Sequence, residues 1–409
     1  MRYIIIKRIQ VMVRANSLLY SIYVCLVVAV LCSGMLYMSG LYTQLNSYYM
    51  SRQDLYVYNE SLVNFAINHL EDKDILPDAD ESGVQYYYNV KQYGAFPVVT
   101  AGTFMGNDTV VSSHLVGCGH KDNTALYIPE RGLKTGYSGK VGFLGDVYVP
   151  DAYLTAALVV NTPASLNFNG VIKESEASLP KPIKSIGGVN RGDGVAAKNI
   201  YNVLKEGRLS NSFRNNPLYV SVSSRLSEVT VKGNVIISSP DSLSVSSSAH
   251  LEDVIIIAPK VSFEEGFEGS VQVFADYSIT LGANAKLLYP SFLCINSDTE
   301  AITNIKLNPS SEIYGGIALL GSDYTRVHKN NIYIEENVKA VCDIYCTGDV
   351  SLKSDVQGSV YTNRVSYKTN VIHENVIANV TVGGAGRPGY FVAVPMMYKD
   401  KYEVVKKVI

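Results

Sequence analysis

The strongest structural signal in the chain is VIIIAPKVSFEEGFEGSVQVFADYSITLGANAKLLYPSFLCI, from Val254 to Ile295. Short apolar runs alternate with turn-forming pairs such as Ala258-Pro259 and Ala275-Asp276, and the runs return at nearly even spacing. Within a strand every second side chain points inward. Evenly spaced runs therefore stack each inward Val, Ile or Leu on the matching residue of the next coil. This stretch predicts a β-solenoid.

The pattern extends on both sides of this stretch. Segments with an apolar, any, apolar start and a polar turn begin at Leu243, Val261, Ile279, Ile305, Ile332 and Val350. A second series of starts, at Val235, Val254 and Val271, has spacings of 19 and 17 residues. An earlier coil is expected around Val141, Phe143, Val147 and Val149. We therefore expect a mainly β protein whose repeats stack on one another.

The flanking segments divide the head into parts. Strands broken by Gly, Pro and Asn-Asp turns predict an antiparallel β region over residues 84–130. The β-solenoid is expected over 131–389, with a loop and short-helix excursion at 187–217 where the repeat fails. Two apolar runs around Lys399-Asp400-Lys401 predict a terminal β-hairpin over 390–409, which would cap the solenoid.

The N-terminal segment has the properties of a membrane helix. No charged residue occurs from Ala15 to Ser51, and the apolar centre from Leu18 to Tyr42 exceeds the ~20 residues that cross a bilayer. Basic residues precede this segment, at Arg2, Lys7, Arg8 and Arg14. They place the N-terminus in the cytoplasm and the head in the periplasm or at the cell surface.

The chain is therefore divided into a basic tail (1–14), a transmembrane helix (15–42), a helical stalk (43–72) and an acidic linker (73–83). A cleaved signal peptide fits less well, because its apolar core would span only about 7 to 15 residues. A lipoprotein signal at Cys32 would need a small residue where Leu31 stands. Small side chains suited to packing against other membrane helices occur at Cys25, Ser33, Gly34 and Gly40.

The basic N-terminus, the segment RANSLLYSIYVCLVVAVL and the helix continuing beyond it resemble the start of atypical minor pilins and pseudopilins. These proteins belong to type IV pilus and type II secretion machines, and the resemblance covers residues 1–70. It implies partners among envelope, secretion or pilus proteins, reached through the membrane helix. One membrane helix with a β-solenoid head also resembles uncharacterised single-pass envelope proteins of the Bacteroidota.

Several classes of function are disfavoured. A net charge of −2 gives no basic surface for nucleic acid, and no phosphate loop or nucleophile elbow is present. His114, Cys118 and His120 lack a second cluster that would complete a zinc site. Calcium-loop spacing from Asp78 to Gly83 ends at Asn89 instead of glutamate, and we regard the tripeptide Arg191-Gly192-Asp193 as accidental. We expect no metal and no cofactor.

An enzymatic head is the less favoured alternative. The acidic residues Asp253, Glu264, Glu265, Glu335 and Glu336 fall at expected coil turns, where solvated carboxylates are common. Exposed tyrosines could contact a sugar ring or a protein; the candidates are Tyr277, Tyr289, Tyr314 and Tyr333. The sequence therefore favours a structural or assembly subunit without catalytic residues. The alternative is a membrane-tethered protein that binds or cleaves glycan. A third class is self-polymerisation, as in cytoskeletal β-helices, which uncapped apolar coil ends would favour and against which the predicted terminal hairpin argues.

Overall fold

The computed structural model describes residues 2–70, 83–119, 123–182, 197–296, 301–321, 329–396 and 401–408, with side chains from residue 17 onward. The protein is mainly β, with one long apolar helix near its N-terminus. Its contacts separate two compact units. One contains residues 1–61, 79–86 and 103–110, and the other contains 62–78, 87–102 and 111–409.

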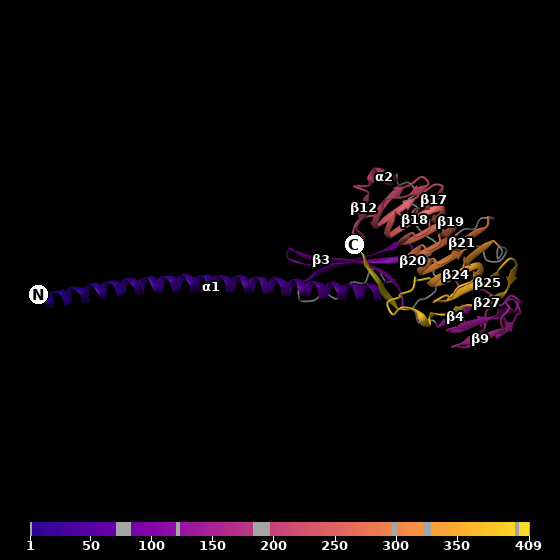
Figure 1. The fold of residues 1–409 in the computed structure, drawn as a ribbon, viewed down its shortest axis with the longest axis horizontal. Coiled ribbons are helices and arrows are strands. Elements are labelled where there is room, and N and C mark those ends of the chain that lie inside the picture. The colour runs from indigo at the N-terminus through magenta and orange to yellow at the C-terminus, as the bar shows by residue number, and fades with distance from the viewer. Residues whose placement is uncertain are drawn as a thin grey trace. The chain divides into compact units, whose positions relative to one another are not determined.

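Helix α1 runs without interruption from Arg2 to Asn68 (Figure 1). Its segment from Ser17 is long and apolar enough to cross a membrane, and its most apolar window has no buried residue. The predicted membrane helix and stalk are thus one helix, which ends at Asn68 rather than at residue 72. Residues 71–82, with most of the predicted linker, lie outside the described residues.

Buried residues appear only in the last turns of α1, among the side chains that the structure describes. In the first unit, Leu55 is buried and its carbonyl accepts a hydrogen bond from Thr103 Oγ1 at 3.0 Å. Asn59 donates to the Val110 carbonyl at 3.3 Å. In the second unit, Leu62, Val63, Ala66 and Ile67 are buried.

A four-stranded sheet has the order β1-β2-β3-β29. Its strands are β1 (Gln85–Tyr93), β2 (Phe96–Met105), β3 (Asp108–Cys118) and β29 (Tyr402–Val408). Strand β29 pairs antiparallel with β3, and Ala393 forms an antiparallel bridge with Cys118. The prediction that residues 390–409 form a hairpin capping the solenoid is therefore wrong. Their partner is a strand almost 300 residues earlier, and residues 397–400 lie outside the described part.

The other strands form what we call the coil stack, residues 124–174 and 198–382. Its first part contains β4 (Thr124–Tyr127), β5 (Thr135–Ser138), β6 (Lys140–Phe143), β7 (Asp146–Val149), η1 (Pro150–Ala152), β8 (Leu154–Ala156), β9 (Ser165–Phe168) and β10 (Ile172–Glu174). Its second part begins with β11 (Lys198–Asn199), α2 (Ile200–Val203), β12 (Arg208–Asn211), β13 (Leu218–Ser221), β14 (Arg225–Leu226), β15 (Thr230–Gly233), β16 (Val235–Ser238) and β17 (Ser242–Val245). Then follow β18 (His250–Phe263), β19 (Glu268–Leu281), β20 (Lys286–Asn296), β21 (Thr303–Leu307), β22 (Glu312–Leu320), β23 (Asn330–Ile334), β24 (Lys339–Leu352), β25 (Val360–Lys368), β26 (Ile372–Glu374), β27 (Val376–Ala378), β28 (Thr381–Val382) and η3 (Gly384–Gly386).

Strand β18 shows how one coil is built. Its start pairs with β15, its middle with β16 and its end with β17, all in parallel. The strand turns a corner at Asp253, whose φ is 58°, and the register shifts again between Ala258 and Lys260. One continuous strand therefore runs over three faces, and its inward residues Val254, Ile256 and Val261 lie in the apolar core.

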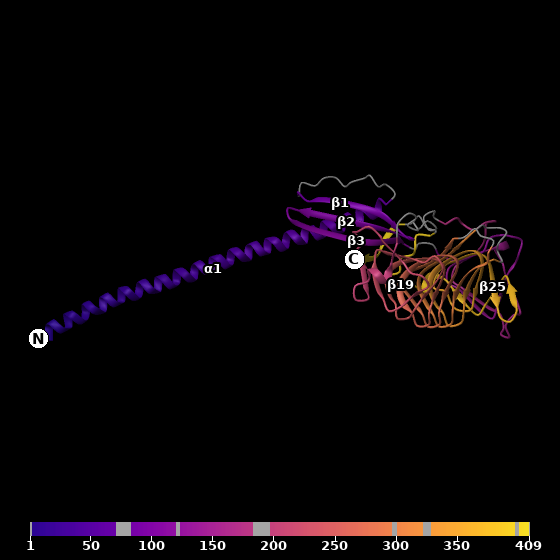
Figure 2. The ribbon, with the colours of Figure 1, turned by 90° about the horizontal axis from the view of Figure 1, so that it is seen from above.

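The predicted alignment of the repeats is confirmed residue by residue. Leu243 pairs with Val261, Val261 with Ile279, Ile279 with Ile305, Ile305 with Ile332, and Ile332 with Val350. All six are buried in one core, and the stacked strands from β19 to β25 lie side by side in Figure 2. Apolar alternation alone was enough to set this register, because a slip of one residue would turn the core outward.

The coils do not stack in chain order. Strand β4 pairs with β25 through Leu126 and Val360, and β7 then pairs with β4, and β10 with β7. Strands β27 and β28 pair likewise with β5 and β6. The expected early coil around Val141 is indeed in the core, but it stacks on the last coil of the chain. The stack also begins at Thr124, inside the predicted antiparallel region 84–130.

The region 187–217 differs from the predicted excursion. Residues 183–196 lie outside the described part. From Lys198 on, however, the segment belongs to the stack: β12 pairs with β15, β13 pairs with β16, and Ile200 of α2 is fully buried in the core. The short helix therefore covers one end of the stack.

Candidate functional site

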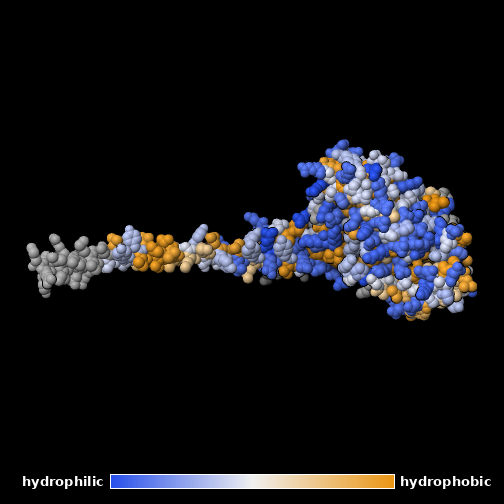
Figure 3. Space-filling view, viewed as in Figure 1, coloured by the Kyte–Doolittle hydropathy of each residue, from blue (hydrophilic) through white to orange (hydrophobic). Residues whose placement is uncertain are grey.

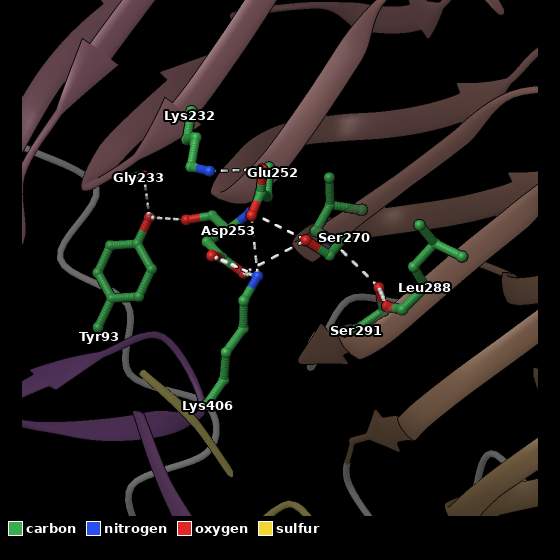
Figure 4. Close-up of polar contacts among 10 residues, drawn as sticks. Tyr93, Lys232, Gly233, Glu252, Asp253, Ser270, Leu288, Ser291 and Lys406 are labelled. Atoms are coloured by element: carbon green, nitrogen blue, oxygen red, sulfur yellow. Dashed lines mark hydrogen bonds and ion pairs between the residues drawn. The ribbon is translucent and has the colours of Figure 1, made fainter. Parts of the chain in front are cut away.

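Charged side chains gather at the corner where β18 bends. We call Tyr93, Lys232, Glu252, Asp253, Ser270 and Lys406 the corner cluster; they come from β1, β15, β18, β19 and β29 (Figure 4). Three of these strands are coils of the stack, and the other two belong to the four-stranded sheet. The cluster thus fastens the sheet to the stack.

Asp253 is the centre of the cluster. Its left-handed backbone conformation is one that Asp tolerates better than most residues, and it leaves the side chain only 2% exposed. Lys406 Nζ lies 2.8 Å from Asp253 Oδ2 and 3.0 Å from Glu252 Oε1. Lys232 Nζ lies 2.9 Å from Glu252 Oε2. The positive charges of Lys232 and Lys406 therefore neutralise the negative charges of Glu252 and Asp253.

A bulge in β29 is associated with the position of Lys406. The register of β29 against β3 shifts between Val404 and Lys406. Bulges of this kind bend a strand and redirect its side chains, and they recur where a specific contact is made. Strand β29 thereby presents an ammonium to the coil stack from the edge of another sheet.

At the corner, backbone amides that have no carbonyl partner in the neighbouring strand donate hydrogen bonds to serine hydroxyl groups. The Asp253 amide donates to Ser270 Oγ at 3.0 Å, and one coil later the Val271 amide donates to Ser291 Oγ at 3.1 Å. Ser270 Oγ lies 3.3 Å from Asp253 Oδ1, to which it donates. Because buried amides without partners are costly, these serines stabilise the bend in successive coils.

Tyr93 joins the end of β1 to the same corner. Its hydroxyl lies 2.9 Å from the Asp253 carbonyl, and the Gly233 and Val235 carbonyls are further away at 3.2 and 3.3 Å. Beside it, the Ala95 amide donates to Gln272 Oε1, and Gln272 Nε2 donates to the Tyr93 carbonyl. The tip of the β1–β2 hairpin is thus bonded to β18 and β19.

We expect Tyr93→Phe to destabilise the folded protein by about 1–2 kcal/mol, because it leaves buried carbonyls with one donor fewer. The measurement is urea unfolding of the detergent-solubilised chain. Tyr87→Phe is the matched control, since Tyr87 lies in the same strand but is 45% exposed. Equal effects of the two substitutions would contradict the role given to the Tyr93 hydroxyl.

Burial and charge pairing set the protonation of the cluster. Burial raises the pKa of Asp253, and Lys406 only partly opposes this. Burial lowers the pKa of Lys406, but Asp253 and Glu252 raise it by more, so that the net shift is upward. Lys406 therefore stays an ammonium at neutral pH and is no nucleophile, while Asp253 is too buried to reach a substrate.

An open groove of about 540 Å³ lies beside the cluster. Its polar lining includes Lys232, His250, Glu252, Glu268 and Ser270. Burial raises the pKa of Glu252, but hydrogen bonds from Lys232 and Lys406 lower it by more, and the net shift is downward. A glycosidase needs one carboxyl with a raised pKa to protonate the leaving group. The pKa of Glu252 is shifted the opposite way, and the neighbouring carboxyl whose pKa is raised, Asp253, has a side chain that is only 2% exposed.

The four candidate contact tyrosines are all partly buried. Tyr289 accepts from the Val392 amide and donates to the Val392 carbonyl, and burial raises its pKa to about 12. Tyr314 donates to Glu312 and lies under Lys339, and Tyr333 lies 4.7 Å from Lys368 Nζ. Tyr277 is half-buried. Intramolecular contacts therefore occupy three of the four rings.

The small helix residues lie on the exposed part of α1. Cys25 is exposed, and Ser33 Oγ donates to the Ala29 carbonyl at 2.7 Å within the helix. A side chain added at Gly34 or Gly40 would meet nothing within 4 Å. These positions are thus open to another helix.

The metal and recognition motifs that the sequence analysis disfavoured lie mostly outside the described residues, including His120, Asp78–Ser82 and the tripeptide at 191–193. In the described part of the chain no three His, Cys, Asp or Glu residues are placed to hold a metal ion. His114 has its pKa lowered to about 4 by burial and by Lys407. Cys118 is fully buried.

The acidic residues at coil turns have two kinds of surroundings. Glu264 pairs with Arg225 and Glu335 with Lys353, on partly exposed side chains of neighbouring coils. Asp253 is different: the expectation that it is solvated is wrong, because the corner turns it inward. The acidic pair Glu252-Asp253 directly before the apolar run of β18 gave no indication of this burial. Tyr93 and Lys406 carried no signal either.

Comparisons with known proteins give no family. No family model matches the chain, and no curated protein matches it. Among solved structures, the competence-associated pilin ComZ from Thermus thermophilus is similar over 89% of this chain and 95% of its own, with 11% identity and a TM-score of 0.19. A TM-score this low carries no argument about fold or function.

Proposed function

We propose that the protein is a single-pass membrane subunit of a bacterial envelope machine, similar in plan to a minor pilin or pseudopilin, whose coil stack is a β-solenoid held outside the cytoplasm. The observation that supports this most is helix α1. Its most apolar window has no buried residue, the segment from Ala15 to Ser51 has no charged residue, and the buried residues lie in its last turns. The apolar segment of such a helix is suited to the bilayer, and its C-terminal turns pack within the folded head.

The head supports a structural role. Its charged groups at the corner cluster neutralise one another, and the hydroxyls there satisfy backbone amides. The basic residues before the uncharged segment favour a cytoplasmic N-terminus by the positive-inside rule. Lipid and the membrane helices of other envelope proteins are then the partners of α1, and no catalytic step is assigned to the head.

Contacts within the membrane provide the test. Ser33 and Gly40 are seven residues apart, so they share one face of α1. We expect Ser33→Ile with Gly40→Ile to reduce recovery of the partner at least tenfold, because bulky side chains keep another helix from close approach. The measurement is a pull-down from detergent-solubilised membranes, with recovered proteins identified by mass spectrometry. Met35→Ile with Tyr42→Ile, at two exposed positions seven residues apart on the opposite face of the same helix, is the control.

The outcomes separate the two functions. Secretion or pilus components recovered with the wild type and the control, but not with the double variant, would support the proposal. Recovery of no envelope protein, together with binding of the wild type to glycan, would reverse it in favour of the glycan-binding alternative. In that case the residues that line the groove beside Glu252 would be the first to mutate in a search for the glycan-binding surface.

A further inference from the structure

One end of the coil stack has no cover among the described residues. We call residues 153–174 the end coil. Strand β8 is at the edge of the sheet β27-β5-β8, and β9 is at the edge of β28-β6-β9. Strand β10 has β7 as its registered partner. Strands β8 and β9 therefore offer backbone groups along their outer edge.

The side chains of the end coil are unusually apolar for an edge. Tyr153, Leu158, Phe168 and Val171 are between 48% and 96% exposed. Figure 3 shows hydrophobic residues at the border of the view where β9 is labelled in Figure 1. Soluble proteins seldom leave such a group uncovered unless it binds something.

The end coil also lacks the usual protection of an edge. No charged residue or histidine occurs from Ala152 to Ile172, although charges on edge strands are the common defence against pairing. The opposite end of the stack differs. It carries helix α2, and its first coil contains Lys198, Lys205, Glu206 and Arg208.

The described segment that follows the end coil, up to residue 182, does not cover it. Beyond Glu174 it runs along the side of the stack, where Leu179 packs on Tyr127, Tyr345 and Tyr361. The Pro180 carbonyl accepts a hydrogen bond from Tyr345 Oη at 3.2 Å. Tyr127 belongs to β4 and Tyr345 to β24, so this path leads away from the end coil.

We propose that the end coil binds the end coil of a second copy of this chain. In a two-fold interface residue i of one copy contacts residue j of the other and j contacts i, so a charge close to the axis would meet its like. A coil without charges meets this condition. A two-fold axis perpendicular to the stack would also set each edge strand antiparallel to an edge strand of the copy, which lets both complete their hydrogen bonds. This inference is independent of the role proposed for the membrane helix.

Cross-linking at the end coil is the first test. In the full chain with Cys25→Ser and Cys32→Ser, all remaining cysteines are buried. We expect Leu158→Cys, in detergent under mild oxidation, to give a disulfide-linked dimer. The matched control is Ile302→Cys, which is 65% exposed beside β21, a strand paired on both edges. Equal dimer yields from the two positions, or none from either, would overturn the proposal.

Charge substitution is the second test, and it distinguishes loss of binding from misfolding. Leu158→Glu with Phe168→Glu should be monomeric in sedimentation equilibrium, with self-affinity reduced at least tenfold, and so should Leu158→Lys with Phe168→Lys. An equimolar mixture of the two should dimerise again, which only folded proteins could do. A wild type that stays monomeric, a glutamate variant that still dimerises, or a mixture that stays monomeric would each refute the interface.

Discussion

Val28→Arg combined with Leu31→Arg is expected to move the protein from the membrane to the soluble fraction. Each arginine near the centre of a spanning helix costs roughly 2.5–3.5 kcal/mol. Two cost about 5–7 kcal/mol, which is more than a thousandfold in the insertion equilibrium. Both positions are at least half exposed within the uncharged segment. The measurement is the fraction of protein that resists extraction by alkaline carbonate.

The control places the same charges further along the same helix. Val57→Arg with Ser61→Arg alters exposed positions beyond the uncharged segment, and it should leave the membrane fraction unchanged. If the wild type were itself extracted by carbonate, or if the Val28 and Leu31 variant stayed in the membrane, α1 would not be a bilayer span. The proposed function would then lose its main support.

The second large effect is expected from Lys406→Met. It leaves the Asp253 carboxylate buried without its cation, and breaking such a pair typically costs about 3–5 kcal/mol. Because Lys406 is 31% exposed, we expect the lower end, about 3 kcal/mol at pH 7. Urea unfolding of the detergent-solubilised chain measures it. Lys353→Met is the control, because its partly exposed pair with Glu335 is expected to contribute no more than about 1 kcal/mol.

The pH dependence tests whether loss of a charge pair causes the defect, because Lys406 pairs with both Asp253 and Glu252. The folded-state pKa of Asp253 is raised above its ordinary value. The folded protein therefore holds a proton on Asp253 more tightly than the unfolded chain does. This stabilises the fold at pH values below the ordinary pKa of aspartate, and the stabilisation is lost as the pH rises through the pKa that Asp253 has in the folded protein. Without Lys406 that pKa rises further. The defect of Lys406→Met should then be small in acid and should grow as the pH rises toward 7.

A double variant tests whether Asp253 is the carboxylate that destabilises the protein when Lys406 is removed. Lys406→Met with Asp253→Asn removes the charge together with its partner, so it should recover part of the lost stability and flatten the pH dependence. A Lys406→Met defect that is the same at every pH, or that Asp253→Asn leaves unchanged, would show that the loss comes from packing of the lysine side chain.

Local patterns predicted the parts of the fold that depend on neighbours in the chain. The starts from Leu243 to Val350 could be aligned because inward alternation and turn spacing repeat in each coil. The uncharged segment of α1 was equally clear. Neither pattern shows in which order the coils stack in the folded protein, so the pairing of β4 with β25 could not be predicted from the sequence.

The candidate site was predicted less well, for a physical reason. Acidic residues at turns are usually solvated, so Asp253 was expected to be exposed. Its burial depends on Lys406, which lies about 150 residues away and is positioned by the pairing of β29 with β3. Tyr289 is a similar case, because the segment around Val392 covers it. Long-range pairings of this kind leave no periodic trace.

The stacking of β4 on β25 has a consequence for synthesis of the chain. A solenoid built in chain order can grow from its N-terminus as the ribosome releases each coil, since each repeat needs only its predecessor. Here the coil containing Val141 cannot meet its inner neighbour until residues up to Val382 have emerged. Folding of the first coils must therefore wait for the last ones, and the nascent chain must keep an apolar segment soluble in the meantime.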